Sequence, residues 1–163
     1  KNWMPTEHPN PYFDFIYSPT QVVKDGEVIG EQSDLFIHQG TPLIAYEDGY
    51  ISIAHAVISV TGQRTYGQIA LKWDMEGKLL EHSQFFHFNV GWREGLKETI
   101  EFACGLLWSK GKEGEELLVG VGIKDELIGL CRLPVSKFKW EPYSDTMWYS
   151  WRWDETPNRT EIH

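Results

Sequence analysis

Alternation between apolar and polar or small residues constrains this chain more than any other feature of its sequence. Residues 50–60 read YISIAHAVISV, and the same period of two recurs at 65–73, 79–88, 100–108, 116–121 and 126–133. Successive side chains of a β-strand point to opposite faces of its sheet, so this pattern is typical of half-buried strands. No segment longer than about ten residues shows a helical period, and 93–99 has room for one helical turn at most. The sequence therefore predicts an all-β protein.

Turn signals separate the predicted strands. Asp25-Gly26 and Asp48-Gly49 are strong hairpin dipeptides, and Glu76-Gly77 and Glu113-Gly114 are weaker ones. Strands at 12–18, 50–55 and 116–122 suggest an uneven repeat, near the length of one four-stranded propeller blade. At roughly 45 residues per blade, the chain holds about three and a half blades. We therefore expect a partial or open β-propeller, with a β-sandwich as the alternative.

Composition limits the size and the partners of the molecule. With 163 residues, we expect one domain of about three blades at 1–138, on which a tryptophan-rich segment, 139–163, packs. The net charge of −9 disfavours binding to nucleic acid and to anionic membranes. No apolar run is long enough to span a bilayer and no signal peptide is present, which slightly favours a cytoplasmic location.

Aromatic residues make up 14% of the chain, including 8 Trp. Aromatic rings fill β-cores, and they also line sugar-binding clefts because the C–H faces of sugars stack on flat rings. Within 139–163, Trp148, Trp151 and Trp153 either pack on the last blade or form a platform for a sugar or a partner subunit. The 2 Cys make no disulfide framework, and no spacing predicts a metal site or a cofactor.

Several short motifs occur in an order that resembles one family. They are Lys1-Asn2-Trp3-Met4-Pro5, Gly40-Thr41-Pro42-Leu43-Ile44, Asp48-Gly49-Tyr50-Ile51 running to His55, Tyr66, Glu101-Phe102-Ala103-Cys104-Gly105, and Leu118 to Asp125. The order is similar to that of the mannoside-phosphorylase family of five-bladed propellers (glycoside hydrolase family 130), and to propeller-like domains associated with bacterial glycosyltransferases.

The resemblance implies roles for single residues. His55 and Tyr66 fall where the family forms its phosphate or substrate pocket, Asp125 where an Asp faces the sugar, and Asn2 near the cavity. Glu101 lies in another of the matching segments. The catalytic acid of the family would lie on a blade upstream of Lys1, so we assign no catalytic residue and leave open whether the chain is an enzyme.

Some of the candidate site residues also have an explanation that involves the fold alone and no ligand. A lone His on a strand, such as His55, is commonly a hydrogen-bonded structural residue. Glu101 interrupts an apolar strand, where strict alternation favours the solvent face. Asp125 follows a Gly-x-Gly segment and precedes Glu126, so a plain hairpin turn explains it as well as a sugar contact does.

From these patterns we expect a carbohydrate-recognising or carbohydrate-processing domain with a sugar or glycan as its ligand. The alternative is a non-enzymatic assembly module that pairs through its aromatic surface. About three and a half blades leave a sheet edge and an apolar face uncovered, so we also expect a homo-oligomer or a missing partner segment.

Overall fold

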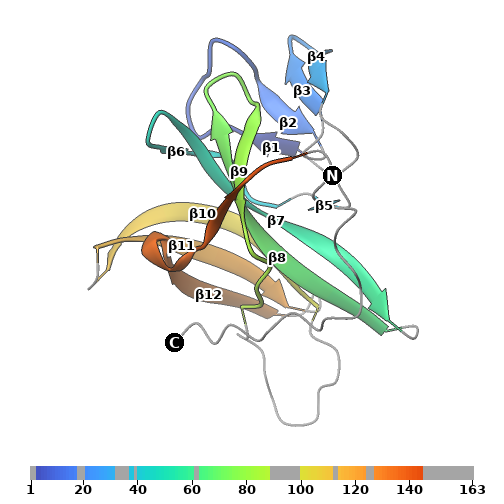
Figure 1. Ribbon diagram of the computed structural model, residues 1–163, viewed down its shortest axis with the longest axis vertical. Helices are drawn as coiled ribbons and strands as arrows, with labels where there is room; N and C mark the ends of the chain where they lie inside the picture. The colour runs from blue at the N-terminus through green and yellow to red at the C-terminus, as the bar shows by residue number, and fades with distance from the viewer. Residues whose placement is uncertain are drawn as a thin grey trace.

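The computed structural model describes residues 3–17, 21–31, 37–38, 40–60, 63–88, 100–111, 114–123 and 127–144. These residues form three antiparallel sheets and contain no α-helix, in agreement with the predicted all-β class (Figure 1). A single turn of 3-10 helix, η1 (Val135–Lys137), follows the last long strand.

The strands of the N-terminal sheet follow one another in the order β1-β2-β3-β4, and those of the C-terminal sheet in the order β10-β11-β12. The central sheet has the order β13-β9-β8-β7-β5, and β6 also pairs with β7. The strand bounds are β1 (Trp3–Pro5), β2 (Phe15–Tyr17), β3 (Gln21–Lys24), β4 (Glu27–Glu31), β5 (Ile37–His38), β6 (Ile44–Tyr46), β7 (Gly49–Val60), β8 (Gln63–Asp74), β9 (Leu79–Ser83), β10 (Glu101–Gly111), β11 (Gly114–Ile123), β12 (Leu127–Pro134) and β13 (Trp140–Pro142).

Two apolar cores lie on the two faces of the central sheet, because alternate residues of β7 point to opposite sides. Ala54 and Ala56 face a core shared with the N-terminal sheet, which contributes Met4 among others. Ile51 and Ile53 face a second core, shared with the inner face of β10–β12. Figure 1 shows the N-terminal sheet and the C-terminal sheet on either side of the long β7–β8 hairpin.

The structure confirms the turn predicted at Asp25-Gly26, and it moves the turn predicted at Asp48-Gly49 by one residue, because Tyr46 pairs with Gly49 at the start of β7. Asp25 and Gly26, with φ of 51° and 82°, join β3 to β4 as a type I′ turn requires. In the β6–β7 hairpin the residue with positive φ is Glu47, at 51°, rather than Gly49.

One predicted strand is too long. The alternation at 79–88 predicts a single strand, but β9 ends at Ser83. Beyond it, Phe85 enters the first core while Phe86 and Phe88 enter the second, and only Phe86 bridges to Gln68. The aromatic pattern therefore reflects packing into two cores and not the period of a strand.

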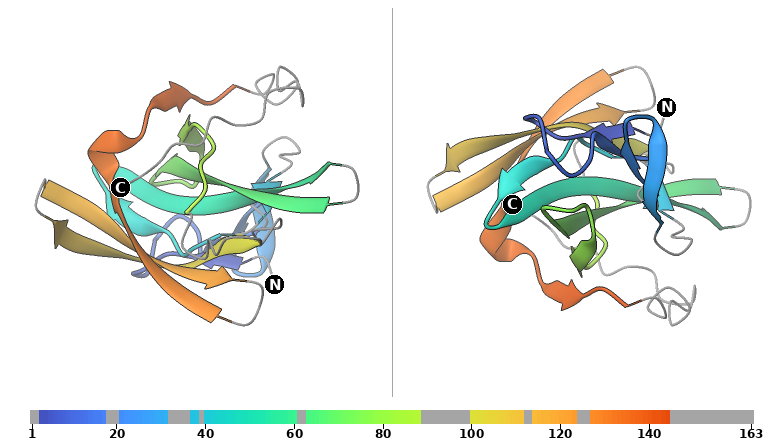
Figure 2. Two further views of the ribbon diagram at one scale, coloured as in Figure 1. Left: turned by 90° about the horizontal axis from the view of Figure 1, so that it is seen from below. Right: turned by 90° about the horizontal axis from the view of Figure 1, so that it is seen from above.

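The described part of the C-terminal segment returns to the central sheet. After β12 the chain curves round the central sheet at the end of β7 and β8 that lies opposite their hairpin turn, and β13 pairs with β9 (Figure 2). Phe138 and Trp140 pack against the second core. The tryptophans at 148, 151 and 153 lie outside the described residues.

Candidate functional site

Two of the predicted site residues are in ring contact. His55 on β7 and Tyr66 on β8 stack with their ring centroids 5.2 Å apart and their planes 30° apart. His38, paired with His55 across β5 and β7, lies 5.9 Å from it, and Phe102 of β10 lies 6.5 Å from it. We call these four residues the histidine cluster. His38 is exposed and the other three are half-buried, so the cluster reaches the surface.

Glu101 adjoins this cluster through Gln68, which pairs with His55 in the β7–β8 register. The Gln68 side chain donates from Nε2 to the backbone oxygen of Glu101 (2.6 Å) and accepts from the backbone N–H of Ala103 (3.3 Å). The expectation that Glu101 faces solvent is wrong, because only 1% of the residue is exposed. Glu101 and Ala103 are two residues apart in β10 and lie on the same face of the strand, and Ala103 faces the second core. Asp125 and Asn2 lie outside the described residues.

A cavity of about 730 Å³ lies elsewhere, on the side of the N-terminal sheet. It is formed by β3 and β4, the turn between β8 and β9, the loop before β2 and the residues after β13. We call it the tyrosine cavity, and it is lined by Tyr12, Val22, Ile29, Gly30, Glu31, Glu76, Gly77, Lys78, Leu79, Tyr143 and Ser144. None of the residues predicted from the sequence lines it.

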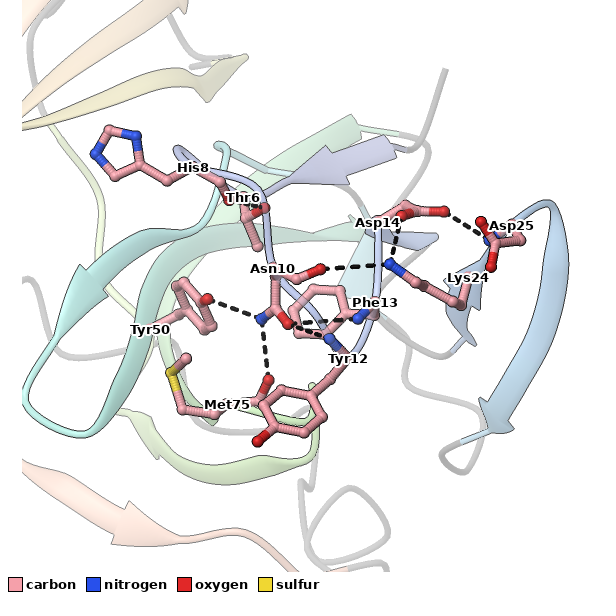
Figure 3. Close-up of polar contacts among 10 residues, drawn as sticks. All are labelled: Thr6, His8, Asn10, Tyr12, Phe13, Asp14, Lys24, Asp25, Tyr50 and Met75. Atoms are coloured by element: carbon pink, nitrogen blue, oxygen red, sulfur yellow. Dashed lines mark hydrogen bonds and ion pairs between the residues drawn. The ribbon is translucent and has the colours of Figure 1, made fainter.

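Asn10 fixes the loop that carries Tyr12 at the cavity wall (Figure 3). Its buried side chain donates from Nδ2 to the hydroxyl of Tyr50 (2.8 Å) and to the backbone oxygen of Met75 (3.0 Å). Its Oδ1 accepts from the backbone N–H of Tyr12 (2.6 Å). One amide therefore holds the loop before β2 against both β7 and the β8–β9 turn, so Tyr12 has a defined position.

A charged pair lies beside this network. Asp14 accepts from the backbone N–H of Asp25 (2.6 Å) and from Nζ of Lys24 (3.2 Å) (Figure 3). These two donors hold the pKa of the Asp14 carboxyl below its usual range, and the backbone hydrogen bond is the larger cause. Lys24 also donates to the backbone oxygen of Asn10 (3.4 Å), which links the β3–β4 turn to the Tyr12 loop.

The cavity wall carries more negative than positive charge. Among the side chains that line the cavity, Glu31 and Glu76 are acidic and Lys78 is the one basic residue. Glu31 also accepts a hydrogen bond from Nε2 of Gln21 (3.3 Å) on the neighbouring strand. The wall thus combines flat aromatic surface with both donors and acceptors, and its charge suits neutral ligands better than anions.

Lys72 forms a third polar cluster, at the end of β8 away from His55. Its Nζ lies 2.8 Å from a carboxylate oxygen of Glu81 and 3.7 Å from one of Glu47, and it sits over the rings of Trp140 (4.6 Å) and Tyr46 (5.3 Å). Burial alone would lower the pKa of Lys72, but the hydrogen bond to Glu81 and the two carboxylates raise it above its ordinary value. Because the Lys72 ammonium is already engaged by these carboxylates and rings, we assign this cluster a structural role.

Sequence reasoning missed the tyrosine cavity because its walls come from distant parts of the chain. Tyr12 follows a proline-rich loop, and Tyr143 lies in the aromatic C-terminal segment. Both are aromatic residues next to loops, a signal that the composition contained, but nothing local shows that they approach one cavity.

In the described part of the chain, no group of three His, Cys, Asp or Glu side chains could hold a metal ion. The same residues include no helix with the length and hydropathy that a membrane crossing needs. No family model, curated protein or solved structure matches the chain.

Proposed function

We propose that the protein recognises carbohydrate, and the observation that carries this proposal is the tyrosine cavity. Its volume of about 730 Å³ is in the range of small-molecule sites. Tyr12 and Tyr143 offer ring faces on which the C–H face of a sugar can stack. Glu31, Glu76 and Lys78 supply acceptors and donors for sugar hydroxyls.

The ligand class that fits best is a neutral sugar. Two carboxylates against one ammonium would repel a phosphorylated or uronic sugar, and the net charge of −9 acts in the same direction. The apolar part of the wall, which includes Val22 and Leu79, suits the C–H face of a hexose ring rather than a fully hydrated ion.

The histidine cluster is the second location for the same function. The resemblance to the mannoside-phosphorylase family predicts substrate contacts at His55 and Tyr66, and their ring contact supports that prediction. Glu101 stays a predicted contact of this location, and so do Asp125 and Asn2. The proposal is for recognition and assigns no catalytic residue.

For the architecture we propose a partial propeller of the same kind. Two observations support it: the outer sheets are antiparallel meanders, and the three sheets are stacked face to face in chain order. A β-sandwich is the alternative, since stacked sheets are its defining feature too.

The test is binding of neutral oligosaccharides, with mannose-containing ones first, measured by calorimetry against a uronic-acid oligosaccharide. Replacing Tyr12 or Tyr143 by Ala should weaken binding about 10-fold, because each removes a stacking face worth about 1 kcal/mol or more. Tyr17→Ala is the matched control, since Tyr17 is exposed on β2 and does not line the cavity. Its affinity should equal that of the wild type.

A second pair of variants separates the two locations. His55→Ala and Tyr66→Ala should leave affinity unchanged if the tyrosine cavity is the site. Loss of binding in these two variants, with the tyrosine-cavity variants unaffected, would move the site to the histidine cluster. Absence of binding to every sugar in the panel would overturn the proposed function.

A further inference from the structure

Strand β12 forms the outer edge of its sheet and carries an exposed apolar surface. Within the described residues it pairs with β11 alone. Leu127, Ile128 and Leu130 are 59%, 84% and 70% exposed. A strand edge also presents unpaired backbone N–H and C=O groups, so β12 combines two features that favour pairing with another strand.

The apolar surface continues across the outer face of the sheet. Leu107 of β10 is 58% exposed. Gly105 has open space above its Cα, and in register it lies opposite Gly120, which in turn lies opposite Leu130. This face is therefore flat as well as apolar, and a neighbouring sheet could approach it closely.

Charges that protect other edges are missing from β12. The edge strand β4 also exposes apolar side chains, but Glu27 and Glu31 flank them. Strand β13 carries Glu141 and Pro142. The charged residue of β12 is Arg132, whose Nη1 already contacts Ser109 (2.7 Å) and Glu116 (3.6 Å). Natural edge strands are usually guarded by charges or proline, so the absence of a free charge here points to a partner.

We propose that β12 pairs with β12 of a second copy of this chain, antiparallel and about a twofold axis at Gly129. This register places Ile128 opposite Leu130 of the second copy, and the reverse, so two apolar pairs form on one face of a continuous six-stranded sheet.

If two copies of the chain associate, charge favours the β12 surface over surfaces that carry acidic side chains. At −9, two copies repel each other wherever acidic side chains meet. The β12 edge brings no carboxylate of β12 to the contact, since its sequence is LIGLCRLP. Added salt should therefore strengthen the dimer, because it screens the remaining repulsion without weakening apolar contacts.

Sedimentation velocity of the whole chain over a concentration series tests the proposal. We expect a concentration-dependent dimer that tightens between 50 and 500 mM NaCl, on the order of several-fold. Ile128→Lys and Leu130→Lys should each raise the dimer dissociation constant at least about 10-fold, since each places a lysine opposite an apolar side chain of the second copy and sets the two lysines diagonally across the twofold axis. Val28→Lys, at a 52% exposed residue of β4, is the matched control and should dimerise like the wild type.

Amide hydrogen exchange of the unmodified protein keeps the test independent of how the variants fold. Amides of β12 should exchange more slowly at high than at low protein concentration, while those of β4 should not change. A monomer at every concentration, exchange of β12 that ignores concentration, or equal dissociation by Val28→Lys would each overturn the proposal.

Discussion

Gln68 shows how much of the fold one buried amide can organise. Its backbone N–H and C=O both bond to Phe86 at 2.8 Å, while its side chain bonds to the backbone of β10 at Glu101 and Ala103. Gln68 itself is fully buried. Buried polar groups need hydrogen-bond partners, and the Gln68 side chain finds them on β10. These bonds join the central sheet to the C-terminal sheet, and they fix the distance between the histidine cluster and Glu101.

At the same scale, the two thiols should differ in reactivity. Burial raises the pKa of Cys131 to about 11, with a smaller contribution from Glu101, whereas Cys104 is exposed. The thiolate is the nucleophile, so at pH 8.5 iodoacetamide should label Cys131 about 100-fold more slowly than an unperturbed thiol. The rate at Cys131 should rise about tenfold per pH unit toward pH 11. Mass spectrometry of peptides would follow both sites, and equal labelling at pH 8.5 would contradict this prediction.

Among the elements, the β6–β7 hairpin depends on a glycine for a reason other than its turn. The positive φ belongs to Glu47. A Cβ at Gly49 would overlap the backbone oxygen of Trp73 on β8, where Gly49 pairs with Asp74. The glycine thus permits close approach of two backbones at the start of the longest hairpin.

Gly49→Ala should therefore destabilise the fold by about 1–3 kcal/mol, because backbone cannot move aside as a flexible side chain can. This corresponds to a fall in Tm of roughly 3–10 °C. Gly105→Ala is the matched control, since a Cβ there meets nothing within 4 Å and should change stability by less than about 0.5 kcal/mol. Thermal unfolding followed by circular dichroism would compare the two, and similar Tm values would contradict the close-approach argument.

In the whole molecule, the two proposed surfaces lie on different sheets. The tyrosine cavity is lined by β3, β4 and the β8–β9 turn, whereas β12 belongs to the C-terminal sheet on the other face of the central sheet (Figure 1). A dimer through β12 would leave both cavities open, so the assembly and the sugar site are compatible.

A dimer with two open cavities should bind bivalently, a prediction that needs both proposals. On a surface densely coated with a bound oligosaccharide, the wild type should bind at least about 100-fold more tightly than to the same sugar in solution. Leu130→Lys should lose this gain while keeping its affinity for the free sugar. Surface plasmon resonance beside calorimetry would measure both, and an equal gain for the monomeric variant would contradict bivalency.

The period-two pattern was sufficient to predict the long strands β7, β8, β10, β11 and β12, because side-chain alternation is a property of the local backbone. The strand predicted at 50–60 is β7, and that at 65–73 lies within β8. The Asp25-Gly26 turn was predictable for the same reason, since positive φ at both central residues is a local requirement.

What only the tertiary structure decided is which faces are covered. Alternation placed Glu101 on one face of its strand, but stacking on the central sheet makes that face the buried one. The tyrosine cavity likewise depends on contacts between distant segments, because Asn10 binds Tyr50 and the β8–β9 turn and so places Tyr12. The backbone N–H of Tyr143 donates to the backbone oxygen of Leu80 and holds Tyr143 at the same cavity. Sequence periodicity carries no information on contacts between distant segments, since these depend on how the sheets stack.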